Sequence, residues 1–476
     1  MDVRCSFCNI SSTDTKHIAQ KGELAICSEC LSLVREILEE FCISDESIKK
    51  GIYCSFCNRE QGGERRVFEG KSINICIECV NEIEAEIKKE KKGHQLEKET
   101  KGFSSKLESI LYTRVKEGIR QISAYEIPTL GYRIKLDGNE SPFNLPEDVL
   151  EKVLKELKEI QINRYPDAQA TTLRDKISSI VRFPKEGILL GNGSDELIEL
   201  LMITFSGKTQ RVLYPVPTFS MYRIISVALG LEPIEVELDD GFDIDLKAML
   251  REIRRGDPDL IFLASPNNPT GNRFSDEKVF EIINNSTCPV ILDEAYCDFS
   301  GKTFLPLIEK HENLMVLRSM SKVGFAGIRL GILFGNPRLI KEINKVRLPY
   351  NINSLTQKIA EIVLDNSEFV RENIQLIVRE KKRVFETLKL MGIEAFPSDA
   401  NFILFRVSDA DYVFRELANR GILIRNFNSP GRLKNCMRVT IGKPEENTEF
   451  LESLKDIIPA LKEREENIDN KRNKTP

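Results

Sequence analysis

The segment S-M-S-K-V-G-F-A-G-I-R-L-G, from Ser319 to Gly331, follows the apolar run Met315–Leu317 and leads into the apolar run Leu330–Phe334. It places Lys322 after two small hydroxyl residues and before glycines and Arg329. Most lysines are solvated on the surface, but this one lies in a nearly neutral Gly/Ser-rich segment directly after a predicted strand. We therefore interpret Lys322 as a nucleophilic amine at the end of a buried strand.

Similar β-branched runs alternate with helix-like segments on both sides of this segment. The alternation predicts an α/β domain with a largely parallel sheet. The predicted strands are Gly187–Leu190, Arg211–Tyr214, Leu260–Ala264, Val290–Leu292, Met315–Leu317 and Leu330–Phe334.

The run V-I-L-D-E-A-Y, Val290–Tyr296, is a predicted buried strand that ends in Asp293, with Tyr296 three residues later. An acid at the carboxyl end of such a strand faces the crevice where ligands of α/β proteins bind. The four letters D-E-A-Y alone fit a helix cap equally well. Their spacing from Lys322 favours the functional interpretation.

Two glycine-containing turns follow other predicted strands. L-L-G-N-G-S-D-E-L-I-E-L-L (Leu189–Leu201) is typical of a strand, a turn and an amphipathic helix, and a helix start is an anion site. S-P-N-N-P-T-G (Ser265–Gly271) places Asn268 in a tight turn. The backbone N–H groups at the predicted helix start are those of Gly193, Ser194 and Asp195.

An amine, an acid and an anion site are what pyridoxal phosphate (PLP) requires of a protein: a lysine to bond the cofactor, an acid to keep the pyridine nitrogen protonated, and a basin for the phosphate. Lys322, Asp293 and the glycine turn supply these three groups. Asn268 and Tyr296 are then expected to contact the phenolic oxygen of the ring. The sequence therefore predicts a PLP site.

Together these segments resemble the fold-type I aminotransferases, and among them the histidinol-phosphate aminotransferase family. The resemblance runs from about Val115 to Lys443 and includes I-K-L-D-G-N-E-S-P-F, N-R-Y-P-D, Y-P-V-P-T-F-S-M-Y, N-F-I-L-F and M-R-V-T-I-G. It implies a homodimeric enzyme domain over residues 111–465. Its large domain would lie at about 160–350, and the flanking segments would form a small α+β domain.

The resemblance also implies roles for individual residues. Phe219 would stack on the pyridine face, and Tyr165 would reach the phosphate of the PLP bound in the partner subunit. Arg438 would clamp the α-carboxylate of the substrate, and Arg425 would face a distal phosphate. The family's N-E-N-P-Y-G reads N-E-S-P-F-N here, which alters the substrate pocket. The remaining groups of the phosphate cup would be Ser319, Ser321 and Arg329.

An internal repeat occupies the first 79 residues. Eight cysteines form two copies of C-x2-C-x18-C-x2-C, offset by 49 residues, and each copy opens with C-S-F-C. Four thiolates complete a tetrahedral zinc site with no open position, so we predict two structural Zn²⁺ sites. The copies, at residues 1–45 and 50–95, resemble the zinc-binding domain of ClpX, which implies dimerisation or docking of a protein or peptide. The predicted ligands are Cys5, Cys8, Cys27 and Cys30, and Cys54, Cys57, Cys76 and Cys79.

Composition limits the remaining possibilities. The formal net charge is −5, so we expect no nucleic-acid binding driven by phosphate neutralisation. The chain lacks a secretory signal and an apolar run long enough to span a membrane, so we expect a cytoplasmic protein. Polar, charged segments at 96–110 and 466–476 are expected to be a linker and a tail.

The function that the sequence favours is amino-group transfer between an amine or amino acid, possibly phosphorylated, and 2-oxoglutarate. A PLP decarboxylase or lyase of the same fold, similar to threonine-phosphate decarboxylase, is an alternative because cofactor residues alone do not fix which bond at the α-carbon breaks. A transaminase of a specialised biosynthetic pathway, acting on another amine, is a further alternative. A different hypothesis is an adaptor or regulator that binds a partner through the zinc modules. The intact lysine, acid and arginine set argues against it.

Overall fold

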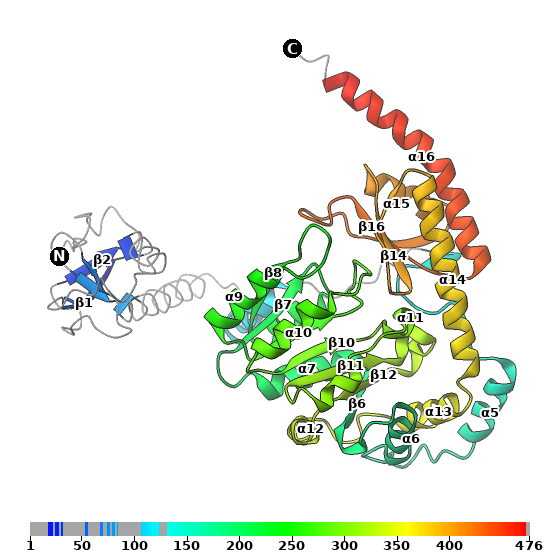
Figure 1. Ribbon diagram of the computed structural model, residues 1–476, viewed down its shortest axis with the longest axis horizontal. Helices are drawn as coiled ribbons and strands as arrows, with labels where there is room; N and C mark the ends of the chain where they lie inside the picture. The colour runs from blue at the N-terminus through cyan, green and yellow to red at the C-terminus, as the bar shows by residue number, and fades with distance from the viewer. Residues whose placement is uncertain are drawn as a thin grey trace. The chain divides into compact units, whose positions relative to one another are not determined.

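The computed structural model divides into two compact units, residues 1–117 and 118–476 (Figure 1). Within the described residues, no helix combines the length and apolarity needed to cross a membrane. The described residues are 18–21, 24–27, 30–31, 53–55, 67–69, 74–76, 79–80, 83, 106–122 and 131–472, with the side chains of 18–21, 24–25, 27, 67–69, 76 and 462–472 excepted.

Among the described residues of the first unit, two pairs of antiparallel strands have the same register. The pair Ile18 and Cys27 in one of them corresponds to Val67 and Cys76 in the other, again 49 residues along the chain. The repeated cysteine spacing therefore coincides with a repeated pair of strands. The strands are β1 (Ile18–Lys21), β2 (Leu24–Cys27), β3 (Val67–Glu69) and β4 (Asn74–Cys76), and the helices α3 (Lys106–Arg114) and α4 (Glu117–Gln121) follow.

The second unit is built on a seven-stranded sheet. All its strands run parallel except β12, which is antiparallel to both of its neighbours, β11 and β6. The sheet confirms the prediction of a largely parallel α/β domain. In spatial order the strands are β6 (Ile188–Asn192), β12 (Leu330–Phe334), β11 (Leu314–Ser319), β10 (Val290–Asp293), β9 (Leu260–Ala264), β7 (Arg211–Val216) and β8 (Glu232–Glu237).

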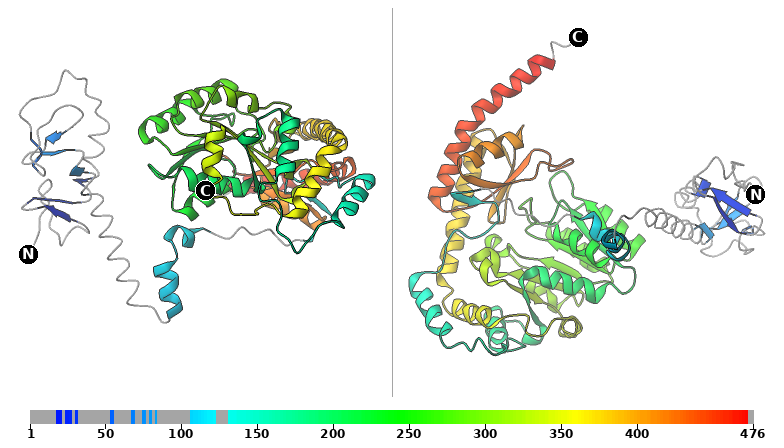
Figure 2. Two further views of the ribbon diagram at one scale, coloured as in Figure 1. Left: turned by 90° about the horizontal axis from the view of Figure 1, so that it is seen from below. Right: turned by 180° about the vertical axis from the view of Figure 1, so that it is seen from behind.

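Helices cover both faces of this sheet (Figure 2), as expected for strands that are apolar on both sides. In β10, Val290 and Leu292 pack into one hydrophobic cluster and Ile291 into the other, following the two-residue period of a strand. One face carries α6 (Thr171–Val181), α9 (Leu246–Gly256), α10 (Asp276–Asn285) and α13 (Ser354–Asp365). The other carries α7 (Gly193–Phe205), α8 (Met221–Leu229) and α12 (Pro337–Ile343).

A second, five-stranded sheet forms the small domain with its own core. Its fifth strand, β5, comes from the segment before the large sheet and the other four come from the segment after it, so the chain enters and leaves through the small domain. In spatial order they are β13 (Glu394–Ala395), β14 (Phe402–Arg406), β16 (Cys436–Thr440), β15 (Ile422–Asn426) and β5 (Ile134–Leu136). Their helices are α14 (Glu368–Leu390), α15 (Ala410–Asn419) and α16 (Pro444–Arg472), while α5 (Glu147–Leu157) packs on α13.

The last helix differs from the sequence expectation. We predicted a polar tail from residue 466, but α16 continues to Arg472. Its final turns consist largely of Glu, Lys, Arg and Asn. Glu, Lys and Arg are good helix formers even without a surface to pack on.

Candidate active site

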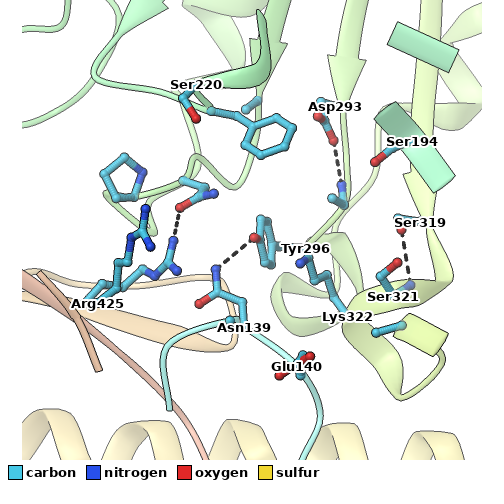
Figure 3. A pocket seen from close by; sticks show the side chains of 18 of the residues that line it. Asn139, Glu140, Ser194, Ser220, Asp293, Tyr296, Ser319, Ser321, Lys322 and Arg425 are labelled. Carbon is cyan, nitrogen blue, oxygen red and sulfur yellow. Dashed lines mark hydrogen bonds between the residues drawn. The ribbon is translucent and has the colours of Figure 1, made fainter. Parts of the chain in front are cut away.

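A cavity of about 460 Å³ lies where the carboxyl ends of the parallel strands of the large sheet face the small domain. Twelve of the residues predicted for the cofactor and substrate line it (Figure 3). They are Ser194, Asp195, Phe219, Asn268, Asp293, Tyr296, Ser319, Ser321, Lys322, Arg329, Arg425 and Arg438.

Lys322 lies on a single turn of 3-10 helix, Met320–Val323, directly after β11. The hydroxyl of Ser319 caps this turn by accepting from the backbone N–H of Ser321 at 3.2 Å. The Lys322 Nζ atom lies 5.8 Å from the centre of the Tyr296 ring. The strand end and its cap therefore direct the amine into the cavity beside that phenol.

Asp293 is the last residue of β10 and is 5% exposed. Its carboxylate accepts from the Tyr222 hydroxyl at 2.7 Å and from the backbone N–H of Ala295 at 3.1 Å. Burial raises the pKa of Asp293 to about 6 although both hydrogen bonds favour the ionised form. Burial beside this carboxylate also raises the pKa of Tyr222, so the phenol stays protonated and keeps donating.

The next residue of the D-E-A-Y motif has a separate, structural role. The Glu294 carboxylate is buried, and it accepts from the Arg318 guanidinium at 3.1 Å and from the Thr303 hydroxyl at 2.7 Å. The two adjacent acids therefore differ in role. Asp293 lines the cavity, whereas Glu294 forms a buried ion pair with Arg318.

The predicted anion site forms at the start of α7. Gly193 has φ +81°, and its backbone N–H donates to the Arg329 carbonyl at 2.7 Å. A Cβ atom at Gly193 would meet the Arg329 guanidinium and force that side chain to move, and the positive φ independently favours glycine. Arg329 Nη2 in turn donates to Asp195 Oδ2 at 3.0 Å. The helix N-terminus and a guanidinium thus converge with Ser194 at one end of the cavity.

Two arginines of the small domain occupy the other end. Arg438 is 6% exposed and donates to the Asp137 carbonyl at 2.6 Å and to Oδ1 of Asn268, so it bridges the two domains. Arg425 lies directly opposite Arg438 on the neighbouring antiparallel strand. Like charges in this arrangement destabilise a sheet unless an anion lies between or beside them.

Sequence reasoning missed Tyr222 and Asn139, which contact predicted site residues, and Thr440, which contacts Asn139. Tyr222 donates to Asp293, Asn139 donates to the Tyr296 hydroxyl at 2.9 Å, and Thr440 donates to Asn139 at 3.1 Å. All three belong to segments that we had singled out, Y-P-V-P-T-F-S-M-Y, I-K-L-D-G-N-E-S-P-F and M-R-V-T-I-G. The signal in the sequence was that each of the three is a polar residue within a motif whose other residues had already been given a role.

Tyr165 does not line the cavity of its own chain. It is 80% exposed and stacks on Tyr350, with ring centres 4.4 Å apart. Its predicted contact involves a partner subunit and stays a prediction.

The cysteines of the repeat are only partly covered by the described residues. Cys5, Cys8 and Cys57 lie outside them, and of Cys27 and Cys76 only the backbone is described. Cys54 and Cys79 are both buried, and the Cys54 Sγ donates to the Cys79 Sγ at 3.8 Å. The first and last cysteines of the second copy thus meet.

Comparison with known proteins assigns the second unit to a family. Residues 133–454 match the family model of class I and II aminotransferases. Histidinol-phosphate aminotransferase 2 of Nitrosococcus oceani is 44% identical over 346 residues, which are 72% of this chain and 96% of that protein. The histidinol-phosphate aminotransferase of Aquifex aeolicus is 42% identical over 350 residues, 73% of this chain and 99% of that protein.

Solved structures agree. The histidinol-phosphate aminotransferase of Clostridium acetobutylicum superposes with a TM-score of 0.63 at 28% identity, over 68% of this chain and 98% of that one. The L-threonine-O-3-phosphate decarboxylase of Porphyromonas gingivalis superposes with a TM-score of 0.60 at 21% identity, over 68% and 99%, and shows the shared fold alone. The chain therefore belongs to the class I and II aminotransferases, PLP-dependent enzymes, and within them to the histidinol-phosphate aminotransferase family.

Proposed function

We propose that this aminotransferase exchanges an amino group between an amine that carries a distal anionic group and 2-oxoglutarate. Histidinol phosphate, named by the relatives, is the first amine to test. The observation that carries the proposal is the pair Arg425 and Arg438, directly opposite one another and both lining the cavity that holds Lys322.

The residues present fit PLP. Bound there, PLP would supply an electron sink for bonds broken at the substrate α-carbon. Asp293, whose burial raises its pKa, is stabilised as a carboxylate by a cationic partner such as a protonated pyridine nitrogen. The backbone N–H groups of Ser194 and Asp195 and the Arg329 guanidinium would hold the phosphate at the start of α7, because the Gly193 N–H already donates to the Arg329 carbonyl.

Other side chains of this protein would attach the cofactor, move the proton and hold the ring. Lys322 Nζ would bond the cofactor, and it would later carry the proton that leaves the substrate α-carbon. Tyr296 and Asn268 would hold the phenolic oxygen of the ring, and Phe219 would cover its face. Each of these side chains lines the one cavity.

The two arginines define the substrate class. Arg438 is anchored by Asp137 and Asn268 and packs over the Phe402 ring at 5.1 Å, so its position is fixed before a ligand arrives. A preorganised guanidinium suits a carboxylate, which both 2-oxoglutarate and its product glutamate carry next to the reacting carbon. Arg425 is half-buried and would meet the distal phosphate or second carboxylate.

The test is an Arg425→Gln variant assayed with histidinol phosphate and 2-oxoglutarate. Loss of a hydrogen-bonded charge partner should lower kcat/KM for the phosphorylated amine about ten- to one-hundred-fold. The matched control is Arg415→Gln, an exposed small-domain arginine that donates to the Asp411 carbonyl. Equal kcat/KM in both variants would exclude Arg425 from substrate binding, and release of carbon dioxide in place of glutamate would identify a decarboxylase.

We also propose that the cysteine repeat binds two structural zinc ions. Two thiolates at about 2.3 Å from one tetrahedral zinc are about 3.8 Å apart. The separation of 3.8 Å between the Cys54 and Cys79 Sγ atoms supports a shared metal. A module of about forty residues buries little core, so the metal would supply much of its folding free energy.

Metal analysis of the purified full chain tests the zinc proposal. Two zinc ions per chain are expected, and Cys54→Ser should lower the content to one. Cys288→Ser, at a buried cysteine of the large domain, is the control that should keep both. A wild-type chain without zinc would refute the proposal.

For the modules we propose dimerisation or docking of a protein or peptide, and for the enzyme unit a homodimer in which Tyr165 reaches the partner's cofactor. Its 80% exposure and the exposed Tyr350 against which it stacks support a role at an interface. Sedimentation of the wild type and of Tyr165→Asp separates the two: a Tyr165-dependent dimer should weaken, whereas a dimer held by the modules alone should not.

A further inference from the structure

We propose that Asn139 is a positioning residue that holds the Tyr296 hydroxyl as a hydrogen-bond donor toward the phenolic oxygen of the cofactor. This inference rests on the proposed PLP site. It assigns a role to the D-G-N-E segment, which the cofactor and substrate contacts leave unexplained.

The hydrogen bonds around Asn139 fix the direction of its amide. Its backbone N–H donates to Thr440 Oγ1 at 3.0 Å, and the Thr440 hydroxyl donates its single proton to Asn139 Oδ1 at 3.1 Å. Because the amide oxygen is held by Thr440, the NH₂ group is the one that faces Tyr296, and Nδ2 donates to the Tyr296 hydroxyl at 2.9 Å.

This direction determines where the tyrosine proton goes. A phenol that accepts a hydrogen bond from an amide keeps its own O–H for another acceptor. Figure 3 shows Asn139 and Tyr296 pointing toward one another with Lys322 beside the ring. The chain from Thr440 through Asn139 to Tyr296 therefore leaves the tyrosine as a donor into the cavity, and each bond polarises the next.

Asparagine suits position 139 both in its backbone conformation and in the hydrogen bonds of its side chain. Its backbone is left-handed, with φ +54°, a region that asparagine, aspartate and glycine tolerate better than other residues. Asn139 is also 1% exposed, and Asn401 Nδ2 donates to its carbonyl at 3.1 Å, so the loop is held on both sides. Among these three residues, asparagine alone offers a side-chain donor and an acceptor at once.

The chain of hydrogen bonds also crosses between domains. Thr440 and Arg438 lie two residues apart on β16 and therefore on the same face of the strand. Tyr296 belongs to the large domain and packs edge-on against Phe402 of the small one, with ring centres 5.2 Å apart. Strand β16, which carries the proposed substrate arginine, thus also determines that the Tyr296 hydroxyl is left as a hydrogen-bond donor.

The measurable consequence is the pH midpoint of the visible absorbance of bound cofactor. A donor on the phenolic oxygen competes for its lone pairs with the proton on the adjacent nitrogen that joins Lys322 to the cofactor. Losing that donor should raise the midpoint, and Tyr296→Phe should raise it by about 1 to 2 pH units.

Two substitutions at position 139 keep the backbone conformation and separate the effects. Asn139→Asp replaces the donor by a carboxylate that accepts the tyrosine proton, so the midpoint should rise at least as far as in Tyr296→Phe. Asn139→Gly leaves the hydroxyl undirected, so a smaller rise is expected. In a Tyr296→Phe background, Asn139→Gly should add less than about 0.3 pH unit, because the two residues act through one bond.

The controls exclude a general structural effect. Asn435→Gly, at another left-handed asparagine of the small domain, should leave the midpoint unchanged. Thr440→Val should mimic Asn139→Gly and Thr440→Ser should restore the wild-type midpoint, which provides a test should position-139 variants fail to fold. An equal shift from Asn139→Gly in the wild-type and Tyr296→Phe backgrounds, or no shift in either, would overturn the inference.

Failure of this inference is distinguishable from failure of the proposed site. If the wild type shows no visible cofactor absorbance, or if Lys322→Ala retains it, the PLP site itself is wrong. If that absorbance is present and depends on Lys322, but its pH midpoint does not change in the Asn139 variants, the PLP site is supported and the positioning role of Asn139 is wrong.

Discussion

Replacing Asp293 by asparagine should stabilise the cofactor-free protein while it weakens cofactor binding. The carboxylate is 5% exposed, and burial raises its pKa from 3.8 to about 6. The folded protein therefore binds a proton more tightly than the unfolded chain does, and ionisation of Asp293 opposes folding.

The size of the effect follows from the pKa difference. Each unit of pKa difference between the folded and unfolded states corresponds to about 1.4 kcal/mol, so ionised Asp293 should cost about 3 kcal/mol at pH 7. The favourable contribution of the protonated acid is complete below pH 3.8 and disappears as the pH rises through about 6. Asparagine has no proton to lose at these pH values, so the variant avoids this loss.

Urea unfolding of the wild type and of Asp293→Asn, both freed of cofactor, measures the difference in unfolding free energy between them. That difference should grow in favour of the variant between pH 4 and pH 6.5 and stay level above. Any change in the hydrogen bonds to Tyr222 and Ala295 adds an offset that does not depend on pH. A difference that is constant from pH 4 to pH 8 would refute the argument that this acid is held in a desolvated site.

Two other substitutions probe the cofactor site, each with a matched control. Gly193→Ala should weaken PLP affinity at least tenfold because the added methyl meets the Arg329 guanidinium, whereas Gly301→Ala, also at positive φ but with no described atom within 4 Å of the new methyl, should leave the PLP dissociation constant unchanged. Tyr222→Phe removes a hydrogen bond that lowers the pKa of Asp293, so the pH above which PLP binds tightly should rise by about one unit in a titration of affinity against pH. Tyr214→Phe, whose hydroxyl donates to Glu235 at 3.1 Å, should not move that pH, and an equal shift in both variants would refute a specific role for Tyr222.

The sequence predicted the residues that one strand end or one turn positions locally. Asp293 and Ser319 end strands of the large sheet, and Gly193 begins a helix, so local periodicity and turn chemistry located all three. Because parallel strands end at one edge of the sheet, their convergence followed from the predicted fold class. The strand predictions were confirmed to within about two residues for the same reason.

The contacts that the sequence did not reveal join distant segments. Tyr222 and Asp293 are 71 positions apart, and Asn139 and Tyr296 are 157 apart. Such pairs depend on how helices and domains pack, which single-sequence periodicity does not encode. The antiparallel orientation of β12 is a similar case, since strand direction is set by the path of the chain after Lys322 and not by the residues of the strand.

Amino-group balance with the full chain tests the central claim most directly. With PLP, histidinol phosphate and 2-oxoglutarate, we expect one glutamate for each amine consumed, no carbon dioxide, and loss of both turnover and visible cofactor absorbance in Lys322→Ala. Consumption of the amine without glutamate, or turnover that survives in Lys322→Ala, would contradict the account.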